Sequence, residues 1–276
     1  MSKSNFKRLL CTGLSLAWFG LFSAPGAQES IPLHYDISWH KDMPVTFFAA
    51  FASVYGNYRY SQMSVPDEVD VLDPTDLLPW DRPVVGRYNK NADKVSDWAA
   101  ALGVAPLALA GYSWYSGDVG GKDFAAYVLM LSQALALQNG VNLMVRSMQI
   151  WPRPYVYATE GDGAEAAKDA RGEAYGSFFS GHTSAAFTIA VFTGEWFSEI
   201  YPESPYKGIV WAGSLSAAGM VGALRIAAGK HFPSDVIMGA LVGTGISLSV
   251  IRIHKTAGSK FSLYALPNAA GAVVHF

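Results

Sequence analysis

The side chains best suited to catalysis fall in three short segments, and their types suit a site that binds an anion and transfers protons. The segments hold Arg146 and Arg153; Ser180, Gly181 and His182; and Arg225, His231 and Asp235. Arginine fits anionic oxygens well, because its planar guanidinium donates several hydrogen bonds in a fixed geometry. Histidine gains and loses a proton near neutral pH. These residue types together predict chemistry on an anionic compound.

The first two segments each have a local reason to form a site. If the first is helical, Arg146 and Arg153 share one face two turns apart, and the prolines beside Arg153 then end the helix. In the second, a glycine beside a hydroxyl residue comes just before an apolar stretch. A helix that begins there presents free backbone N–H groups at its positive end, which binds anions.

The third segment joins a histidine to a carboxylate. Asp235 follows His231 by four residues, and Pro233 between them suits a helix start. The carboxylate can therefore reach an imidazole nitrogen, fix its tautomer and stabilise the imidazolium. Each pattern alone is weak, because arginines at helix ends often only reach water. A Ser-Gly-His tripeptide is also common, and a histidine near an aspartate is more often structural. All three patterns lie at the ends of apolar runs, however, so they could converge on one side of a helical bundle.

In this order and spacing, the three patterns resemble the type 2 phosphatidic acid phosphatase (PAP2) superfamily. That superfamily also contains bacterial class A acid phosphatases and vanadium-dependent haloperoxidases. Its pattern reads Lys-x6-Arg-Pro, then Pro-Ser-Gly-His, then Ser-Arg-x5-His-x3-Asp, and the resemblance covers about residues 96–255. This chain has Arg146 in place of the lysine, Phe179 in place of the first proline and Leu224 in place of the serine. These departures concern the shape of the phosphate pocket and leave the proton-transfer groups intact.

The resemblance implies a mechanism of phosphoryl transfer. His231 is expected to form a phosphohistidine, oriented by Asp235, while His182 protonates the leaving alkoxide and then activates water. The phosphoryl oxygens would be held by Arg146, Arg153, Arg225, the Ser180 hydroxyl and the Gly181 N–H. Such a reaction needs mainly positioning and charge stabilisation. Because no carboxylate cluster suited to a two-metal site accompanies the motifs, we expect neither a metal ion nor a cofactor.

The composition leaves two environments open for the site. Of 276 residues, 51% are hydrophobic and 15% are charged, with a net charge of −2. The chain is too apolar for disorder and lacks the basic excess of a nucleic-acid-binding protein. About 20 apolar residues span a bilayer, and the uncharged runs are 98–117, 124–145, 174–194, 208–224 and 236–251. The amides in the second run also suit a soluble core. We expect an all-α bundle of about five to six core helices, with membrane insertion favoured.

The chain is expected to divide into four parts. Residues 1–27 resemble a cleaved secretory signal peptide, with an uncleaved anchor as the alternative. Residues 28–95 should form irregular and short helical segments, 96–255 the catalytic bundle, and 256–276 a short extended tail with weak hairpin character around an Asn-Ala-Ala-Gly turn. If the signal is cleaved and 43–58 does not span, the five apolar runs alternate so that all catalytic groups face the periplasm. The basic residues after the last run then lie on the cytoplasmic side.

The leading function is therefore a cell-envelope phosphatase in the inner membrane, with a periplasm-facing site and a lipid phosphate or diphosphate as substrate. Phosphatidate, phosphatidylglycerophosphate, undecaprenyl diphosphate and a lipid A phosphate are the candidates. Alternatives are a soluble periplasmic acid phosphatase for small phosphomonoesters, a vanadium haloperoxidase, and an inactive phosphate-binding or structural membrane protein. We expect no nucleic-acid partner and infer no obligate protein partner. Residues 155–179 should form a solvated loop, with a substrate-gating lid as the alternative.

Overall fold

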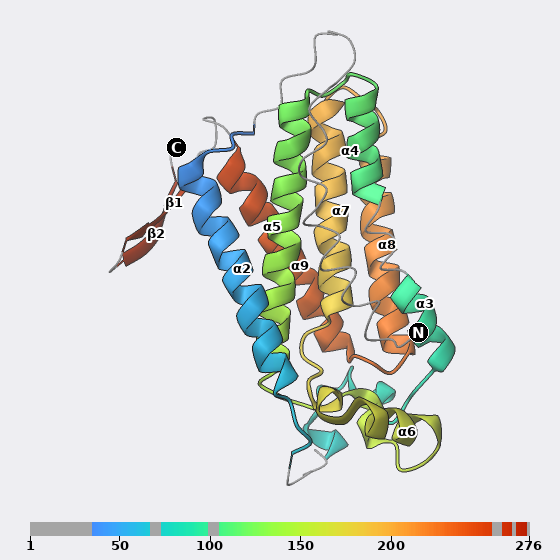
Figure 1. The fold of residues 1–276 in the computed structure, drawn as a ribbon. Helices are drawn as coiled ribbons and strands as arrows, with labels where there is room; N and C mark the ends of the chain where they lie inside the picture. The colour runs from blue at the N-terminus through green and yellow to red at the C-terminus, as the bar shows by residue number, and fades with distance from the viewer. Residues whose placement is uncertain (1–34, 67–72, 99–104, 256–260, 267–268, 275–276) are drawn as a thin grey trace, which may run out of the picture.

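A bundle of long helices forms the body of the molecule. The computed structural model describes residues 35–66, 73–98, 105–255, 261–266 and 269–274 (Figure 1). The helices are α2 (Trp39–Ser61), α3 (Lys90–Trp98), α4 (Ala105–Tyr115), α5 (Gly121–Arg146), α6 (Gly161–Ala170), α7 (Gly181–Ile200), α8 (Lys207–Ala227) and α9 (Pro233–His254). Short 3₁₀ turns lie at Pro74–Asp76, Arg82–Val84, Pro154–Tyr157 (η4) and Arg171–Tyr175 (η5). The predicted all-α bundle is confirmed, whereas the signal-peptide prediction lies outside the described residues.

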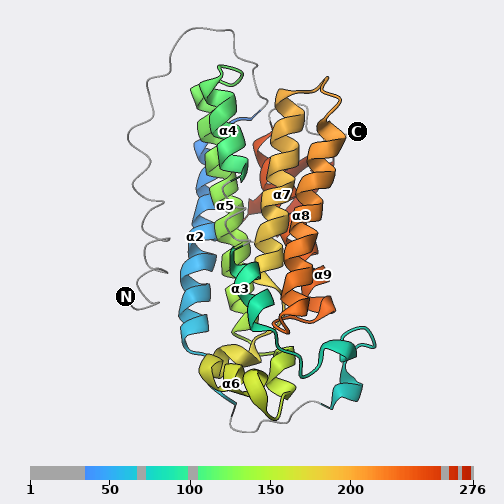
Figure 2. The ribbon, with the colours of Figure 1, turned by 90° about the vertical axis from the view of Figure 1, so that its right-hand side faces the viewer.

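The long helices stand side by side, and the shorter elements gather at their ends. Helix α7 packs against α5, α8 and α9, and α5 also packs against α2. Helix α4 lies beside one end of α5, while α3 and α6 lie toward the other end (Figures 1 and 2). Tyr127 of α5 packs against Phe192 and Trp196 of α7, and these three rings are almost fully buried. The bundle core therefore centres on the contact between α5 and α7.

Helix α2 departs from the expectation of short elements before residue 96. It has 23 residues and runs parallel to α5, since Asp42 meets Gln133 near one end and Tyr60 meets Arg146 at the other. Small residues allow this close approach: a side chain on Gly56 would come within 2.6 Å of the backbone of α5. Residues 43–58 therefore belong to a helix that packs along the bundle. The predicted order of membrane crossings, which begins with 98–117, does not include this helix.

The bundle buries several polar amides and leaves many large apolar side chains exposed. The α5 amides Gln133, Gln138 and Asn142 are only 3–4% exposed. Large apolar side chains on the outer helices are exposed instead, and these include Phe47, Phe48, Phe51, Val54, Ile209, Met220, Ile237 and Leu241. Helices α5, α8 and α9 are long and apolar enough to cross a membrane. Amides in the bundle interior are compatible with lipid outside, so this distribution indicates a membrane protein rather than the soluble core that the amides had also allowed.

Two further segments refine the predictions. The C-terminal tail holds an antiparallel pair, β1 (Phe261–Leu266) and β2 (Ala269–Val274), with Leu266 opposite Ala269. The antiparallel pair fits the predicted hairpin, but Ala269, Ala270 and Gly271 of the predicted Asn-Ala-Ala-Gly turn lie within β2. Residues 155–179 contain α6 and most of two 3₁₀ turns, in place of the expected solvated loop. Tyr155, Ala174 and Ser177 are buried, because this segment covers the end of the bundle at which the predicted site residues lie.

Candidate active site

The two arginines of the first motif meet through a turn. Helix α5 ends at Arg146, and Gln149 has a φ of 50°, so the helix does not continue to Arg153 as predicted. Prolines on both sides of Arg153 explain the break, since a residue before proline disfavours helical backbone. The backbone N–H of Arg153 instead donates to the Ala174 carbonyl at 2.8 Å. The two guanidiniums still interact electrostatically, although helical spacing does not align them.

A tyrosine of α2 holds the guanidinium of Arg146. Arg146 Nη2 donates to the Tyr60 hydroxyl at 3.0 Å, and its Nε donates to the Gly176 carbonyl at 3.0 Å. The guanidinium carbon also lies 4.8 Å from the centre of the Tyr60 ring. A lysine could not make all three contacts, because it has neither a planar fork nor two separate donor nitrogens. The arginine at this position is thus matched to α2, a link that the sequence alone did not reveal.

The predicted anion site at the start of α7 has the expected geometry. Ser180 is the N-cap, and its Oγ accepts from the Thr183 N–H at 3.4 Å and the Thr183 hydroxyl at 2.9 Å. A side chain on Gly181 would come within 2.5 Å of Asn142 Oδ1, so it would have to displace this buried amide. His182 follows in the first turn. The positive end of α7 and the candidate proton donor therefore lie together.

His231 and Asp235 form the pair that their spacing predicted. Helix α9 begins at Pro233, and His231 Nδ1 lies 3.5 Å from Asp235 Oδ2. The carboxylate is 0% exposed and is held by three donors. Oδ2 accepts from Ser177 Oγ at 2.6 Å and the Phe232 N–H at 2.9 Å, and Oδ1 accepts from Trp151 Nε1 at 3.2 Å. Ser177 and Trp151 belong to the segments on either side of η4, and no sequence pattern had marked them.

Burial and positive charge keep His231 neutral. Its side chain is only 2% exposed, and this burial is the main cause that sets its pKa well below the usual 6.5. The positive charges of Arg153, Arg225 and Arg146 lower the pKa further. A neutral imidazole has a free lone pair and can act as a nucleophile. The environment thus favours the reactive form of His231.

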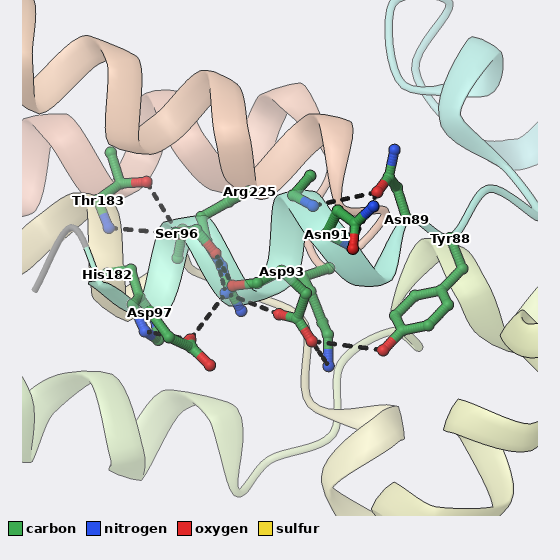
Figure 3. Close-up of polar contacts among 12 residues, drawn as sticks. Tyr88, Asn89, Asn91, Asp93, Ser96, Asp97, His182, Thr183 and Arg225 are labelled. Carbon is green, nitrogen blue, oxygen red and sulfur yellow. Dashed lines mark hydrogen bonds and ion pairs between the residues drawn. The ribbon is translucent and has the colours of Figure 1, made fainter.

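Helix α3 supplies an acidic edge to the site (Figure 3). Arg225 Nη1 lies 3.1 Å from Asp93 Oδ1, 2.7 Å from Ser96 Oγ and 3.4 Å from Asp97 Oδ1. Asp97 Oδ1 is also 3.3 Å from His182 Nε2. Asp93 Oδ2 lies 3.0 Å from the ammonium of Lys230. Carboxylates four residues apart lie on one helix face, yet nothing in the sequence showed which partner that face meets.

The structure brings the eight predicted site residues to one end of the bundle. They come from the end of α5, the turn before η4, the start of α7, the end of α8 and the segment that leads into α9. Arg153 is 7% exposed and its Nε is an unpaired buried donor, so the site holds positive charge that an anion would satisfy. Among the residues that the structure describes, no three His, Cys, Asp or Glu side chains could together hold a metal ion.

Comparison with known proteins points to the same part of the chain. The model of the PAP2 superfamily matches residues 125–259, which carry all eight site residues. Over this segment the chain is similar to the PAP2 superfamily. A lipid A 4'-phosphatase of Porphyromonas gingivalis is 33% identical over 103 residues, which are 37% of this chain and 40% of that protein. The chain thus matches about two fifths of that relative's length. The crystal structure of Aquifex aeolicus LpxE aligns with a TM-score of 0.41 and 23% identity, over 62% of this chain and 92% of that one.

Some residues at the site lie outside the segment that matches the PAP2 superfamily. Tyr60 of α2 and the acidic edge of α3 both precede residue 125, where the match begins. They nevertheless contact Arg146, Arg225 and His182 directly. The part of the chain before the matched segment therefore contributes to the site, a role that the sequence had left open.

Proposed function

We propose that this protein is a metal-independent phosphatase of the cell envelope that hydrolyses a lipid phosphate or diphosphate through a phosphohistidine. The observation that carries the proposal is the setting of His231. Its neutral ring is buried beside Asp235, and the positive charges of three guanidiniums act on it. A nucleophile placed among cations suits attack on a phosphate, whose charge would otherwise repel it.

The geometry supports a two-step reaction. Because His231 Nδ1 faces Asp235, its Nε2 attacks phosphorus, the bond from phosphorus to the leaving oxygen breaks, and His182 gives that oxygen a proton. In the second step His182 takes a proton from water, the water oxygen attacks phosphorus, and the bond to His231 breaks. Arg146, Arg153 and Arg225, the start of α7 and the Ser180 hydroxyl stabilise the phosphoryl charge in both steps.

A lipid substrate fits the outer surface of the bundle. Apolar side chains of α2, α8 and α9 are exposed along the helices, and the site lies at one end, where a headgroup would sit. Among the candidates that the sequence indicated, the name of the Porphyromonas gingivalis relative favours a lipid A phosphate. We place the site on the periplasmic face of the inner membrane, because Arg252 and Lys255 at the other end of α9 suit the cytoplasmic side. The soluble acid phosphatase loses its main support, since the amides of α5 face inward.

The test is a substrate panel on the full-length protein in detergent with a chelator present. The panel holds a lipid A phosphate, phosphatidate, undecaprenyl diphosphate and nitrophenyl phosphate, and released phosphate is measured. We expect metal-independent release that is fastest for a lipid, and loss of release in His231→Ala. Cleavage of nitrophenyl phosphate alone would refute the lipid substrate. Full activity in His231→Ala, or activity that requires added metal, would refute the mechanism.

A further inference from the structure

The acidic edge of α3 contacts both His182 and Arg225, which have different roles in the proposed reaction. One oxygen of Asp97 lies 3.3 Å from His182 Nε2 and 3.4 Å from Arg225 Nη1. His182 is the proposed proton donor, and Arg225 is a proposed phosphate ligand. A single carboxylate oxygen therefore links proton transfer to phosphate binding across α3, α7 and α8.

The neighbouring contacts fix where this oxygen lies. Arg225 is 3% exposed, and its Nη1 is bound by Ser96 Oγ at 2.7 Å and by Asp93 at 3.1 Å. The side chain of Asp93 is 18% exposed, whereas that of Asp97 is 64% exposed. Asp93 thus anchors the guanidinium from within, and Asp97 extends from the same helix toward the open side of the site.

His182 needs such a partner because its surroundings oppose its proton. Burial lowers the pKa of His182, and the positive charges of Arg225 and Arg153 lower it further, so an imidazolium is disfavoured. A carboxylate within about 4–6 Å of an imidazole favours the charged form. A carboxylate bonded to one ring nitrogen also sets the tautomer, and leaves the other nitrogen for the reacting group. Asp97 is the carboxylate that the structure places there.

We propose that Asp97 is the positioning residue of the proton donor, a role that rests on the proposed phosphatase function. Asp97 holds His182 through Nε2, so that the proton passes from Nδ1 to the leaving oxygen as the bond from phosphorus to oxygen breaks. The Nε2 proton stays on the ring throughout, bonded to Asp97. Arg225, held by Asp93, keeps the Asp97 carboxylate in place.

Leaving groups of different basicity isolate this role. The alkoxide of a phosphatidate needs a proton to depart, whereas nitrophenolate departs without one. The readout is kcat/KM, which includes departure of the leaving group but not the later attack of water. Full-length wild type, Asp97→Asn, Asp97→Glu and Asp93→Asn are compared in detergent on short-chain phosphatidate and nitrophenyl phosphate. Asp169→Asn, which removes an exposed carboxylate of α6, is the matched control.

General acid catalysis contributes about 10²–10⁴-fold, so a misplaced but present His182 should lose about tenfold on phosphatidate. In Asp97→Asn we expect this loss of kcat/KM on phosphatidate, while kcat/KM for nitrophenyl phosphate stays within about twofold of wild type. Asp97→Glu should recover most of the loss on phosphatidate. Asp93→Asn should lower kcat/KM for both substrates alike, because this change loosens Arg225 and Lys230. Asp169→Asn should leave kcat/KM unchanged for both substrates.

Other results would overturn the role. An equal loss on both substrates in Asp97→Asn would mean that Asp97 only supports the fold or the phosphate site. Faster cleavage of both substrates would mean that its carboxylate only competes with phosphate for Arg225. Absence of cleavage by wild type would overturn the proposed function and this role together, whereas an active wild type with an unchanged substrate ratio in Asp97→Asn would overturn the role of Asp97 alone.

Discussion

Removal of the Tyr60 hydroxyl should weaken the site through Arg146. That hydroxyl accepts a hydrogen bond from Arg146 Nη2 at 3.0 Å, and the ring lies 4.8 Å from the guanidinium carbon. A hydrogen bond to a charged group is worth about 1.5–3 kcal/mol. The lower figure applies, because Arg146 Nε keeps its bond to the Gly176 carbonyl. Since about 1.4 kcal/mol is a factor of ten, Tyr60→Phe should lower kcat/KM about tenfold.

Removal of the Tyr60 ring together with its hydroxyl should lower kcat/KM further. Tyr60→Leu also removes the cation–π contact, which is worth about 0.5–2 kcal/mol, so its kcat/KM should fall a further few-fold. The assay is phosphate release from nitrophenyl phosphate by the full chain in detergent. Tyr58→Phe is the matched control, because Tyr58 lies on the same helix and is 60% exposed. It should retain wild-type kcat/KM.

A double-mutant cycle decides whether the effect passes through Arg146. Arg146→Lys restores the residue of the family pattern, and a lysine makes fewer contacts with Tyr60. Tyr60→Phe should therefore cost less in this background, with a coupling of about 1 kcal/mol. Tyr60→Phe that stays within about twofold of wild type would refute the reasoning, as would an identical cost in both backgrounds.

Three further predictions concern Asp235, His231 and the packing of α2. Ser177→Ala removes the 2.6 Å donor to Asp235, so kcat should fall about tenfold while the melting temperature changes little; an unchanged kcat would contradict this. Arg153→Gln removes a positive charge that lowers the pKa of His231, so the pKa should rise and the acid limb of kcat/KM should move to higher pH. An acid limb at an unchanged pH would show that the ionisation of His231 does not determine the acid limb of kcat/KM. Gly140→Val introduces a side chain where α2 lies against α5, and the midpoint of chemical unfolding should fall by an amount equivalent to about 1–3 kcal/mol; wild-type stability would contradict this packing.

Local physical signals in the sequence located most of the candidate site. Ser180 caps α7 and Pro233 begins α9 as predicted, because capping hydroxyls and first-turn prolines act within a few residues of themselves. The helix that was considered as far as Arg153 ends at Arg146, since the prolines on both sides of Arg153 and the positive φ at Gln149 turn the chain first. The local signals thus held at the starts of α7 and α9, and they did not hold at this turn.

The missing parts of the site depend on contacts between distant segments. Asp93 is 132 residues from Arg225 in the chain, and Tyr60 is 86 residues from Arg146. No periodicity or capping signal reports such a pairing, because it arises only when the helices pack. The amides of α5 left the environment open for the same reason. Their burial depends on which face of α5 meets α2 and α7.

The most direct test of the account is to trap the phosphoryl group on the protein. The full-length wild type is mixed with a lipid phosphate that carries a radiolabelled phosphoryl group, quenched in base, and mapped by peptide analysis. We predict an acid-labile, base-stable label on His231 that forms as fast as turnover, and neither label nor turnover in His231→Ala. A label on another residue, or full turnover by His231→Ala, would contradict the central claim.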